Sequence, residues 1–258
     1  MGIATKSVPP DYDWMAATRA KRSRSDYAAP TETGKVMLSD ALRGTGRWPE
    51  TQQLTFLTDG VRRGDVQLFY AGDLSLLKRP SVAIVGTRQV TDAGARRTKR
   101  LARELVEAGI VIVSGLAAGV DSIAHQTAIE YGGKTIAVIG TPLTKSYPPE
   151  NASLQETIYR DHLLISQFAP GSKTFKSSFP ERNRLMAAAT DATAVMEASD
   201  TSGTLHQAAE CTRLGRWLFI AKSVADDPAL KWPKKFLQYD TCVALENVTD
   251  ILERIPHS

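Results

Sequence analysis

The hydrophobic and polar positions of this chain follow two patterns that alternate along most of its length. Short runs of β-branched or small apolar residues end at glycine-containing turns, which is typical of buried parallel strands. Between two such runs, at 82–85 and 110–113, apolar residues recur at helical spacing from Thr91 to Ala108 among many charged ones. These three segments predict a βαβ unit. Its turns open at the carboxyl ends of the strands, where open α/β sheets bind ligands.

The alternation continues on both sides of this unit. Further strands are expected at residues 66–70, 135–139, 163–165, 193–196, 217–220 and 242–245. Helices are expected at 123–129, 151–160, 180–189, 204–214, 228–237 and 248–255. Because strands and helices alternate with short links, we predict an α/β fold with a doubly wound, mostly parallel sheet. Residues 1–63 are expected to form an N-terminal extension, partly helical or flexible, before a domain at 64–258.

Composition narrows the possible functions only slightly. The 258 residues suffice for a full core, and their 42% hydrophobic and 23% charged content is ordinary for a globular protein. A net charge of +4 is too small to indicate nucleic-acid binding by itself. The sequence shows no long apolar span and no signal-peptide pattern, so we expect a cytoplasmic protein. Cys211 and Cys242 lie in unrelated patterns, so no disulfide, metal site or cofactor is predicted.

The first candidate site is the turn Gly86-Thr87-Arg88, between the first strand of the βαβ unit and its helix. Backbone N–H groups and the positive end of a helix suit an anion at such a junction. The guanidinium group of Arg88 can also hold a phosphate through two hydrogen bonds. The alternative is a plain tight turn with Arg88 in solvent. The dinucleotide fingerprint G-x-G-x-x-G is absent, which argues against NAD or FAD.

The second candidate site is the segment 176–184. Phe179 would offer a base a stacking surface, while Lys176 and an arginine would hold the backbone of a single strand. Arg182 and Arg184 are two residues apart and cannot share a helix face, so one can contact a ligand while the other braces the sheet. Alternatively, Phe179 belongs to the core and the arginines pair with nearby glutamates.

Three further patterns in the sequence could indicate a site. Ser202-Gly203-Thr204 begins a helix and could bind an anion there. Gly133-Lys134-Thr135 resembles the end of a P-loop but precedes a strand, so we interpret it as a helix stop. Asp121 and His125 share a helix face, and we expect a helix-capping carboxylate beside a packed histidine rather than an acid–base pair.

Taken together, the motifs resemble the DprA/Smf family of DNA-processing proteins over about residues 64–222. The resemblance rests on Gly72-Asp73, Val82-Ala-Ile-Val-Gly-Thr-Arg88, Ser114-Gly-Leu-Ala-Ala-Gly-Val-Asp121 with His125, Tyr147-Pro-Pro-Glu-Asn151 and Phe179-Pro-Glu-Arg-Asn-Arg184. It implies an extended Rossmann-like fold, a homodimer and non-enzymatic binding of single-stranded DNA at the carboxyl ends of the strands. It also implies that the bound strand is passed to a RecA-type recombinase in DNA uptake or recombination.

The resemblance also implies which residues contact the strand. These are Gly86, Thr87, Arg88, Ser114, Gly115, Lys176, Phe179, Arg182, Asn183, Arg184, Ser202, Gly203 and Thr204. Gly86, Thr87 and Arg88 would hold one phosphate, Lys176 would hold a second, and Phe179 would meet a base. The remaining residues would shape and line the pocket.

Two other functions remain open. The first is a protein that binds or hydrolyses a nucleotide or nucleotide second messenger, as in the related phosphoribohydrolase-like Rossmann group. It would use Gly203-Thr204 with Glu197 or Glu210. The second is a scaffold that acts through the N-terminal extension, which carries a basic run at 21–24.

Overall fold

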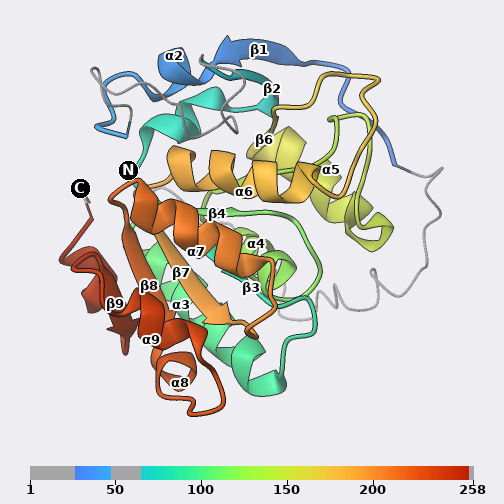
Figure 1. Cartoon of the computed structure of the whole chain (residues 1–258). Helices are drawn as coiled ribbons and strands as arrows, with labels where there is room; N and C mark the ends of the chain where they lie inside the picture. Colours follow the sequence, from blue (N-terminus) through green and yellow to red (C-terminus); the bar gives the residue numbers. More distant parts are fainter. Residues whose placement is uncertain (1–26, 48–64, 256–258) are drawn as a thin grey trace, which may run out of the picture.

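The structure is a computed structural model that describes residues 27–47 and 65–255. Within these ranges, nine strands form one sheet in the order β1-β2-β6-β5-β4-β3-β7-β8-β9 (Figure 1). The strands are β1 Gly34–Met37, β2 Gln67–Gly72, β3 Ser81–Gly86, β4 Val111–Ser114, β5 Thr135–Val138, β6 Leu163–Ser166, β7 Ala192–Glu197, β8 Trp217–Ala221 and β9 Cys242–Leu245. β2 pairs antiparallel with β1 and β6, and all other neighbours are parallel. The prediction of a Rossmann-like, mostly parallel α/β sheet is therefore confirmed.

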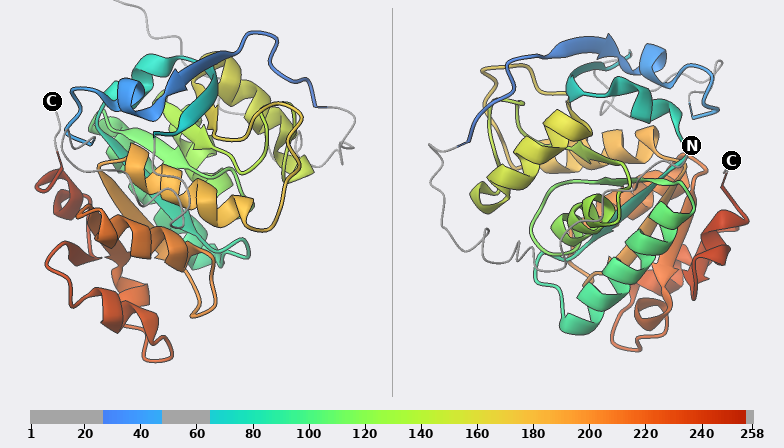
Figure 2. Two further views of the ribbon diagram at one scale, coloured as in Figure 1. Left: turned by 45° about the horizontal axis from the view of Figure 1, so that its top comes forward. Right: turned by 180° about the vertical axis from the view of Figure 1, so that it is seen from behind.

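The chain winds outward from the centre of the sheet in both directions. From β3 it proceeds through β4, β5 and β6, then crosses back to β7 beside β3 and continues through β8 to β9. The helices are α2 Leu38–Leu42, α3 Asp92–Glu107, α4 Val120–Glu130, α5 Ala152–Asp161, α6 Ser178–Ala189, α7 Thr204–Arg213, α8 Lys222–Ala225, α9 Trp232–Phe236 and α10 Thr249–Leu252, with short 3₁₀ helices η2 Leu74–Lys78 and η3 Pro149–Asn151. α6 and α7 pack together on one face of the sheet, and α3 and α4 on the other (Figures 1 and 2). The winding direction reverses between β3 and β7, which makes their carboxyl ends the topological switch point.

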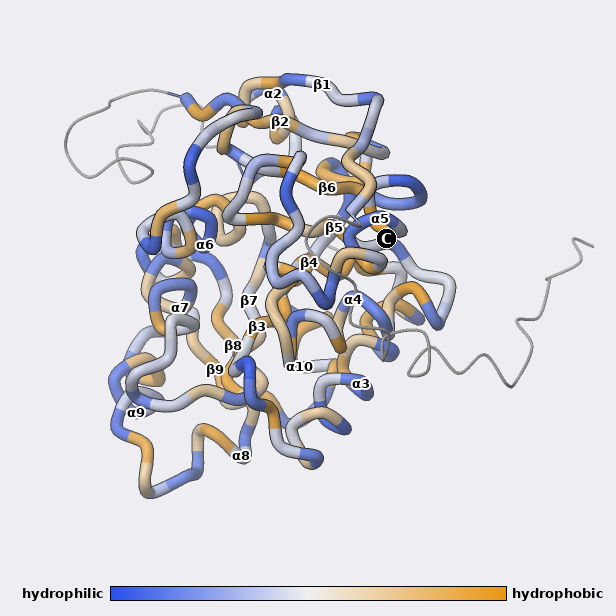
Figure 3. Tube along the Cα trace, turned by 90° about the vertical axis from the view of Figure 1, so that its right-hand side faces the viewer, coloured by the Kyte–Doolittle hydropathy of each residue, from blue (hydrophilic) through white to orange (hydrophobic). Residues whose placement is uncertain are grey.

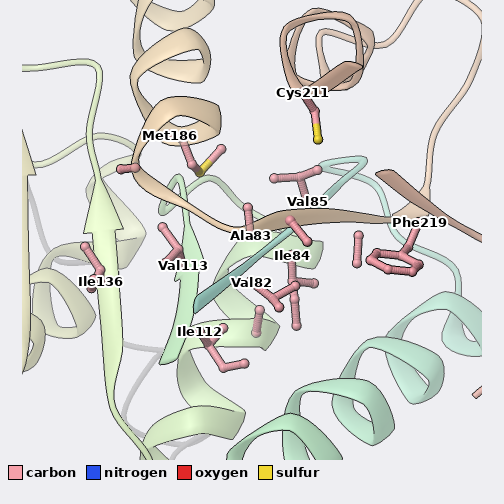
Figure 4. Close-up of a cluster of buried hydrophobic side chains, with 14 of the residues drawn as sticks. Val82, Ala83, Ile84, Val85, Ile112, Val113, Ile136, Met186, Cys211 and Phe219 are labelled. Carbon is pink, nitrogen blue, oxygen red and sulfur yellow. The ribbon is translucent and has the colours of Figure 1, made fainter. Parts of the chain in front are cut away.

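The central strand β3 explains why the apolar runs are continuous. Val82, Ala83 and Ile84 are fully buried, because helices cover both faces of the sheet. Figure 4 shows them between Val113 of β4 and Phe219 of β8. The tube in Figure 3 is hydrophobic along these central strands and hydrophilic along the outer parts of α3.

The part of the N-terminal extension that the structure describes is built into the sheet. β1, which the sequence pattern does not predict, is an antiparallel edge strand on β2, and α2 follows it directly. At residue 47 the chain is anchored by a buried arginine. Arg47 forms an ion pair with Asp191 at 3.1 Å and donates hydrogen bonds to the carbonyls of Ala189, at 2.6 Å, and Arg79, at 2.7 Å. The basic run 21–24 lies outside the described residues, and the domain boundary at residue 63 stays a prediction.

The C-terminal region departs from the predicted helix bounds. The helix expected at 228–237 is shorter in the structure, where only α9 (Trp232–Phe236) is helical. The helix expected at 248–255 is likewise reduced to α10 (Thr249–Leu252). α9 begins at Trp232 because the carboxylate of Asp200, from the loop after β7, accepts the backbone N–H of Trp232 at 3.0 Å. α8 was not predicted. None of the helices in the described ranges has the length and apolar character needed to cross a membrane.

Candidate nucleic-acid interface

The predicted site residues converge on a cleft at the switch point of the sheet. The cleft has a volume of about 420 Å³ and lies between the loops after β3, β4 and β7 and the first turns of α6 and α7. It is lined by nine of the residues that the sequence singles out, namely Gly86, Thr87, Arg88, Phe179, Arg182, Asn183, Ser202, Gly203 and Thr204. A neighbouring hollow of about 180 Å³ adds Gly115 and shares Arg88, Phe179 and Arg182 with the cleft. Arg88, Phe179 and Arg182 therefore border both spaces.

Two backbone N–H groups of the loop after β3 are already used within the protein. The N–H of Thr87 donates to the carbonyl of Glu197 at 2.7 Å, which continues the pairing of β3 with β7. The N–H of Gln89 donates to the Thr87 hydroxyl at 3.2 Å. The exposed side chain of Arg88 is therefore the main group that this loop offers to an anion.

The amino end of α3 is also already occupied. Its first turn is capped by the Thr91 hydroxyl, which accepts the N–H of Gly94 at 3.0 Å. The carboxylate of Glu197 accepts the N–H of Thr91 at 3.1 Å and its hydroxyl at 2.7 Å. A carboxylate at this helix end disfavours a second anion there. This arrangement makes the amino end of α3 less suited to a phosphate than the sequence suggested.

The loops after β3 and β4 hold one another in place. Gly119, at the start of α4, has a φ of 78°, and a Cβ there would lie 2.7 Å from the carbonyl oxygen of Arg88. The Thr87 carbonyl accepts the N–H of Val120 at 3.2 Å. Only glycine tolerates both this backbone conformation and this close approach. The position of Arg88 is therefore set by packing against the loop after β4.

Phe179 is the centre of the aromatic part of the site. The guanidinium carbon of Arg88 lies 5.9 Å from the centroid of its ring, within range of a cation–π contact. The ring of Tyr147 lies 5.3 Å away, centroid to centroid, and is tilted by 44°. A Cβ at Gly140 would approach the Phe179 ring to 2.9 Å, so the ring lies directly over the backbone after β5. Phe179 is half-buried, which leaves part of it available to a ligand.

Arg182 is the arginine that braces the sheet. It is 6% exposed and donates to the carbonyl of Gly115 and, at 2.8 Å, to that of Val138. Its Nε donates to the side-chain carbonyl of Asn183 at 2.9 Å. Burial lowers the pKa of Arg182, and the nearby carboxylate of Asp121 partly opposes this shift. Arg182 therefore joins α6 to β4 and β5, and most of its hydrogen-bonding capacity is used within the protein.

Asp121 and His125 are both hydrogen-bonded within the protein, but Asp121 does not cap its helix as the sequence suggested, because its partners lie in the loop before α4. Asp121 is buried and accepts the backbone N–H groups of Gly115, at 3.2 Å, and Ala117, at 3.3 Å. Burial raises its pKa. The Nδ1 atom of His125 lies 2.6 Å from the Thr135 hydroxyl, and burial lowers the pKa of this histidine to about 3. His125 is therefore uncharged at neutral pH.

Three predicted residues lie outside the two spaces. Ser114 is fully buried and donates to the Ile84 carbonyl at 2.6 Å, so its hydroxyl braces β4 against β3. Lys176 is exposed on the loop before α6, and Arg184 follows on α6 itself. Neither is among the described residues that line the cleft or the hollow.

The structure also adds residues that the sequence analysis did not assign to the site. Ser199 and His206 line the cleft, and Tyr147 and Glu150 line the hollow. The motif Tyr147-Pro-Pro-Glu-Asn151 belongs to the family resemblance, but the sequence assigns no site role to its members. The available signal was their position after a predicted parallel strand, at the same edge of the sheet as Arg88.

Comparison with known proteins decides the family. A family model described as DNA recombination-mediator protein A matches residues 45–256. The chain belongs to this family. Members are found among curated proteins under the names DprA and Smf.

Two curated relatives illustrate the extent of the similarity. The DNA processing protein DprA of Streptococcus pneumoniae is 45% identical over 162 residues, which cover 62% of this chain and 57% of the relative. The Bacillus subtilis DprA is 33% identical over 207 residues, covering 80% of this chain and 69% of the relative. The matches span 57% of the S. pneumoniae protein and 41% of the Smf protein of Synechocystis, roughly half of each.

Solved structures of the family have the same fold. The structure of S. pneumoniae DprA superposes with a TM-score of 0.72 at 33% identity, over 88% of this chain and 76% of that one. That of Helicobacter pylori DprA superposes with a TM-score of 0.67 at 26% identity, over 90% of this chain and 97% of that one. The structure of the H. pylori protein concerns its single-stranded DNA binding mode.

Proposed function

We propose that this chain binds single-stranded DNA across the neighbouring cleft and hollow, and that it acts by binding rather than by catalysis. The observation that carries this proposal is the pairing of Arg88 with Phe179 at the boundary between the two spaces. A cation for the phosphate backbone beside a partly exposed aromatic ring for the bases is the usual arrangement in sequence-tolerant binding of single strands. Family membership supports the same proposal.

The extent of the site supports a ligand longer than one nucleotide. The cleft of about 420 Å³ and the hollow of about 180 Å³ share Arg88, Phe179 and Arg182 in their linings, so we expect one strand to contact both. At the far side of the cleft, the Ser202 hydroxyl donates to the Thr204 hydroxyl at 2.9 Å, at the start of α7. The positive end of α7 and these hydroxyls suit a second phosphate of the same strand. Lys176 is exposed on the loop before α6 and stays a proposed further phosphate contact.

The alternative of a nucleotide hydrolase has less support. It would need Glu197 or Glu210 beside the loop that begins α7. Glu197 instead holds Thr91 and lies 3.7 Å from Arg97, while Glu210 pairs with Arg213. Neither carboxylate is among the described residues that line the cleft. Incubation with nucleoside mono-, di- and triphosphates tests this point, and turnover abolished by Glu210→Gln would overturn the non-catalytic proposal.

Binding of a fluorescently labelled oligothymidylate across a salt series tests the main proposal. Each phosphate contact to a single strand contributes a slope of about −0.7 in a plot of log affinity against log salt. We expect Arg88→Ala to weaken binding and to make this slope shallower by about one such contact. Arg43→Ala, on an exposed arginine at the end of α2, makes the same change in net charge and serves as the control. Absent or salt-independent binding, or equal effects of the two variants, would contradict the proposal.

We further propose that the protein is a cytoplasmic homodimer that delivers its strand to a RecA-type recombinase. Membership of a family described as recombination mediators supports this role, and two buried cysteines without a disulfide suit a reducing compartment. Sedimentation should give twice the mass of the chain. Recombinase assembly on an oligonucleotide should be faster with the chain present, and Arg88→Ala should remove that effect. A monomeric mass would contradict the homodimer, and an unchanged rate of recombinase assembly would contradict the delivery of the strand. Neither result would contradict strand binding itself.

A further inference from the structure

The segment before β1 is attached to α5 and reaches the loop that follows β5. Residues 27–33 run beside α5 before the chain enters the sheet at β1 (Figure 1). The backbone N–H of Ala28 donates to the carboxylate of Glu156 at 3.0 Å, and the hydroxyl of Tyr159 donates to the Ala28 carbonyl at 2.8 Å. This attachment lies outside residues 45–256, the region that the family model matches.

Tyr27 joins this segment to the loop 139–148. Its hydroxyl donates to the carbonyl of Leu143 at 2.9 Å and accepts the side-chain amide of Gln155, on α5, at 2.8 Å. The same amide donates to the carbonyl of Lys145 at 3.1 Å, and Gln155 is fully buried. Burial raises the pKa of Tyr27, so its hydroxyl stays protonated and continues to donate. Two carbonyls of the loop are therefore held through one tyrosine hydroxyl and one buried amide.

The loop 139–148 carries an aromatic residue of the proposed strand site. Two residues beyond Lys145, the ring of Tyr147 lies 5.3 Å from that of Phe179, centroid to centroid, and both residues line the smaller hollow. The ammonium group of Lys145 donates to the Ser172 carbonyl at 3.3 Å, in the loop before α6. A displacement of the loop 139–148 would therefore move the Tyr147 ring and remove a contact to the loop before α6.

We propose that Tyr27 is a positioning residue for the strand site, because it keeps the loop 139–148 in the arrangement that presents Tyr147 beside Phe179. This inference rests on the strand binding proposed above. Tyr27 is not among the described residues that line the cleft or the hollow, so its effect on binding passes through the loop. The apparent affinity for a ligand falls with the fraction of molecules in which the site is formed. Loss of the Tyr27 hydroxyl lowers that fraction, because the loop loses its hydrogen bond at Leu143.

Tyr27→Phe tests this role, because it removes the hydroxyl and keeps the ring. We expect it to weaken binding of an oligothymidylate about fivefold, by lowering the share of molecules with a formed site. The salt dependence should not change, because no phosphate contact is lost. Tyr159→Phe is the matched control, since it removes a hydroxyl that holds the same segment through Ala28 and not through the loop. Its binding should stay within about twofold of the unsubstituted chain.

Coupling to Tyr147 is a readout that a mere loss of stability would not change. In a Tyr147→Leu background, Tyr27→Phe should cause little further loss of binding, because the ring that the loop presents is already absent. Amide hydrogen exchange measures the loop without DNA. The N–H of Lys145 donates to the Pro142 carbonyl at 3.0 Å, and its exchange should be faster in Tyr27→Phe than in Tyr159→Phe.

The outcomes separate the two proposals. If the unsubstituted chain does not bind the oligothymidylate, the proposed function fails. If it binds, but Tyr27→Phe binds equally well or no more weakly than Tyr159→Phe, the positioning role is wrong while strand binding stands. The same conclusion follows if Tyr27→Phe loses the same factor in the Tyr147→Leu background, or if exchange at Lys145 is unchanged. A loss of binding that disappears in that background, with faster exchange at Lys145, supports the role of Tyr27.

Discussion

The guanidinium of Arg182 occupies the space beside Gly115 where any other residue would place its side chain. The arginine is buried and donates to the carbonyl of that same glycine, so the loop after β4 and helix α6 are built around each other. Asp121 completes the arrangement by accepting the N–H of Gly115. Gly115 is not among the glycines with a positive φ, so the close approach of Arg182, and not the backbone conformation, requires a glycine at this position.

We expect Gly115→Ala to lower the free energy of unfolding by about 1–3 kcal/mol, as overpacking does in a core. Denaturant unfolding measures this change. Gly203→Ala is the control, because a Cβ at that position would meet nothing within 4 Å. In an Arg182→Met background, Gly115→Ala should lower the free energy of unfolding by a smaller amount, because the side chain that the new methyl group displaces is shorter and uncharged. Equal costs in the two backgrounds would contradict the proposed clash.

The elements around the central strand were predictable because their burial leaves a strong pattern. β3, β4 and β5 are covered on both faces and appear in the sequence as uninterrupted apolar runs. α3 shows its buried leucines at helical spacing. β1 has no such pattern. Its four residues lie at the edge of the sheet and none is fully buried, so neither a run nor an alternation marks it.

The sequence predicts which segments meet at the site, but it does not predict the contacts between their residues. That strand ends of a parallel sheet meet at one edge follows from topology, which brings Arg88 and Phe179 together. Which arginine of α6 turns inward depends on the space left by Gly115, and this is a tertiary property. Likewise, the Thr87 N–H is taken by Glu197 because the register of β3 against β7 shifts at Gly86. No local rule in the sequence shows that shift.

The buried pair of Arg47 and Asp191 should be a main anchor of the N-terminal segment. Their side chains are almost fully buried, and breaking such a pair leaves an unpaired charge that typically costs about 3–5 kcal/mol. We therefore expect Arg47→Leu to lower the denaturant midpoint strongly. If that variant fails to fold, Asp191→Asn keeps the shape and should show a smaller loss in the same direction.

The exposed pair of Arg43 and Asp40 provides the matched control. Surface ion pairs contribute between 0 and about 1 kcal/mol, so Arg43→Ala should change stability very little. A similar loss for both arginines would mean that the position of residue 47 beside β3 and β7 does not anchor the segment.

His125 should make the fold less stable in mild acid. Its ordinary pKa is 6.5, and burial lowers the pKa in the folded state to about 3. Between these values the unfolded chain binds a proton that the folded chain does not, so stability falls as the pH falls from about 6.5. The loss from this residue amounts to about 2 kcal/mol at pH 5. Burial lowers the pKa of His162 as well, which adds to the slope in the same direction.

Urea unfolding at several pH values between 8 and 5 checks this expectation. His125→Asn removes the titrating group and should flatten the dependence, leaving the part due to His162. The slope is compared rather than the absolute stability, so the result does not depend on how well asparagine fits the site. An unchanged slope in the variant would show that the pKa of His125 is not lowered by folding.

Phe179 should contribute most of the aromatic part of strand binding. A base that stacks on an aromatic side chain contributes about 1–3 kcal/mol, so Phe179→Ala should weaken oligonucleotide binding by about tenfold or more. The loss should hardly vary with salt, because no phosphate contact is removed, and this distinguishes it from Arg88→Ala. Phe179→Leu keeps most of the packing over Gly140 and should show the same loss of binding with a smaller loss of stability. Tyr239→Ala removes an exposed aromatic residue after α9 and is the control. If the leucine variant binds as well as the unsubstituted chain, Phe179 fills space in the site without stacking on a base.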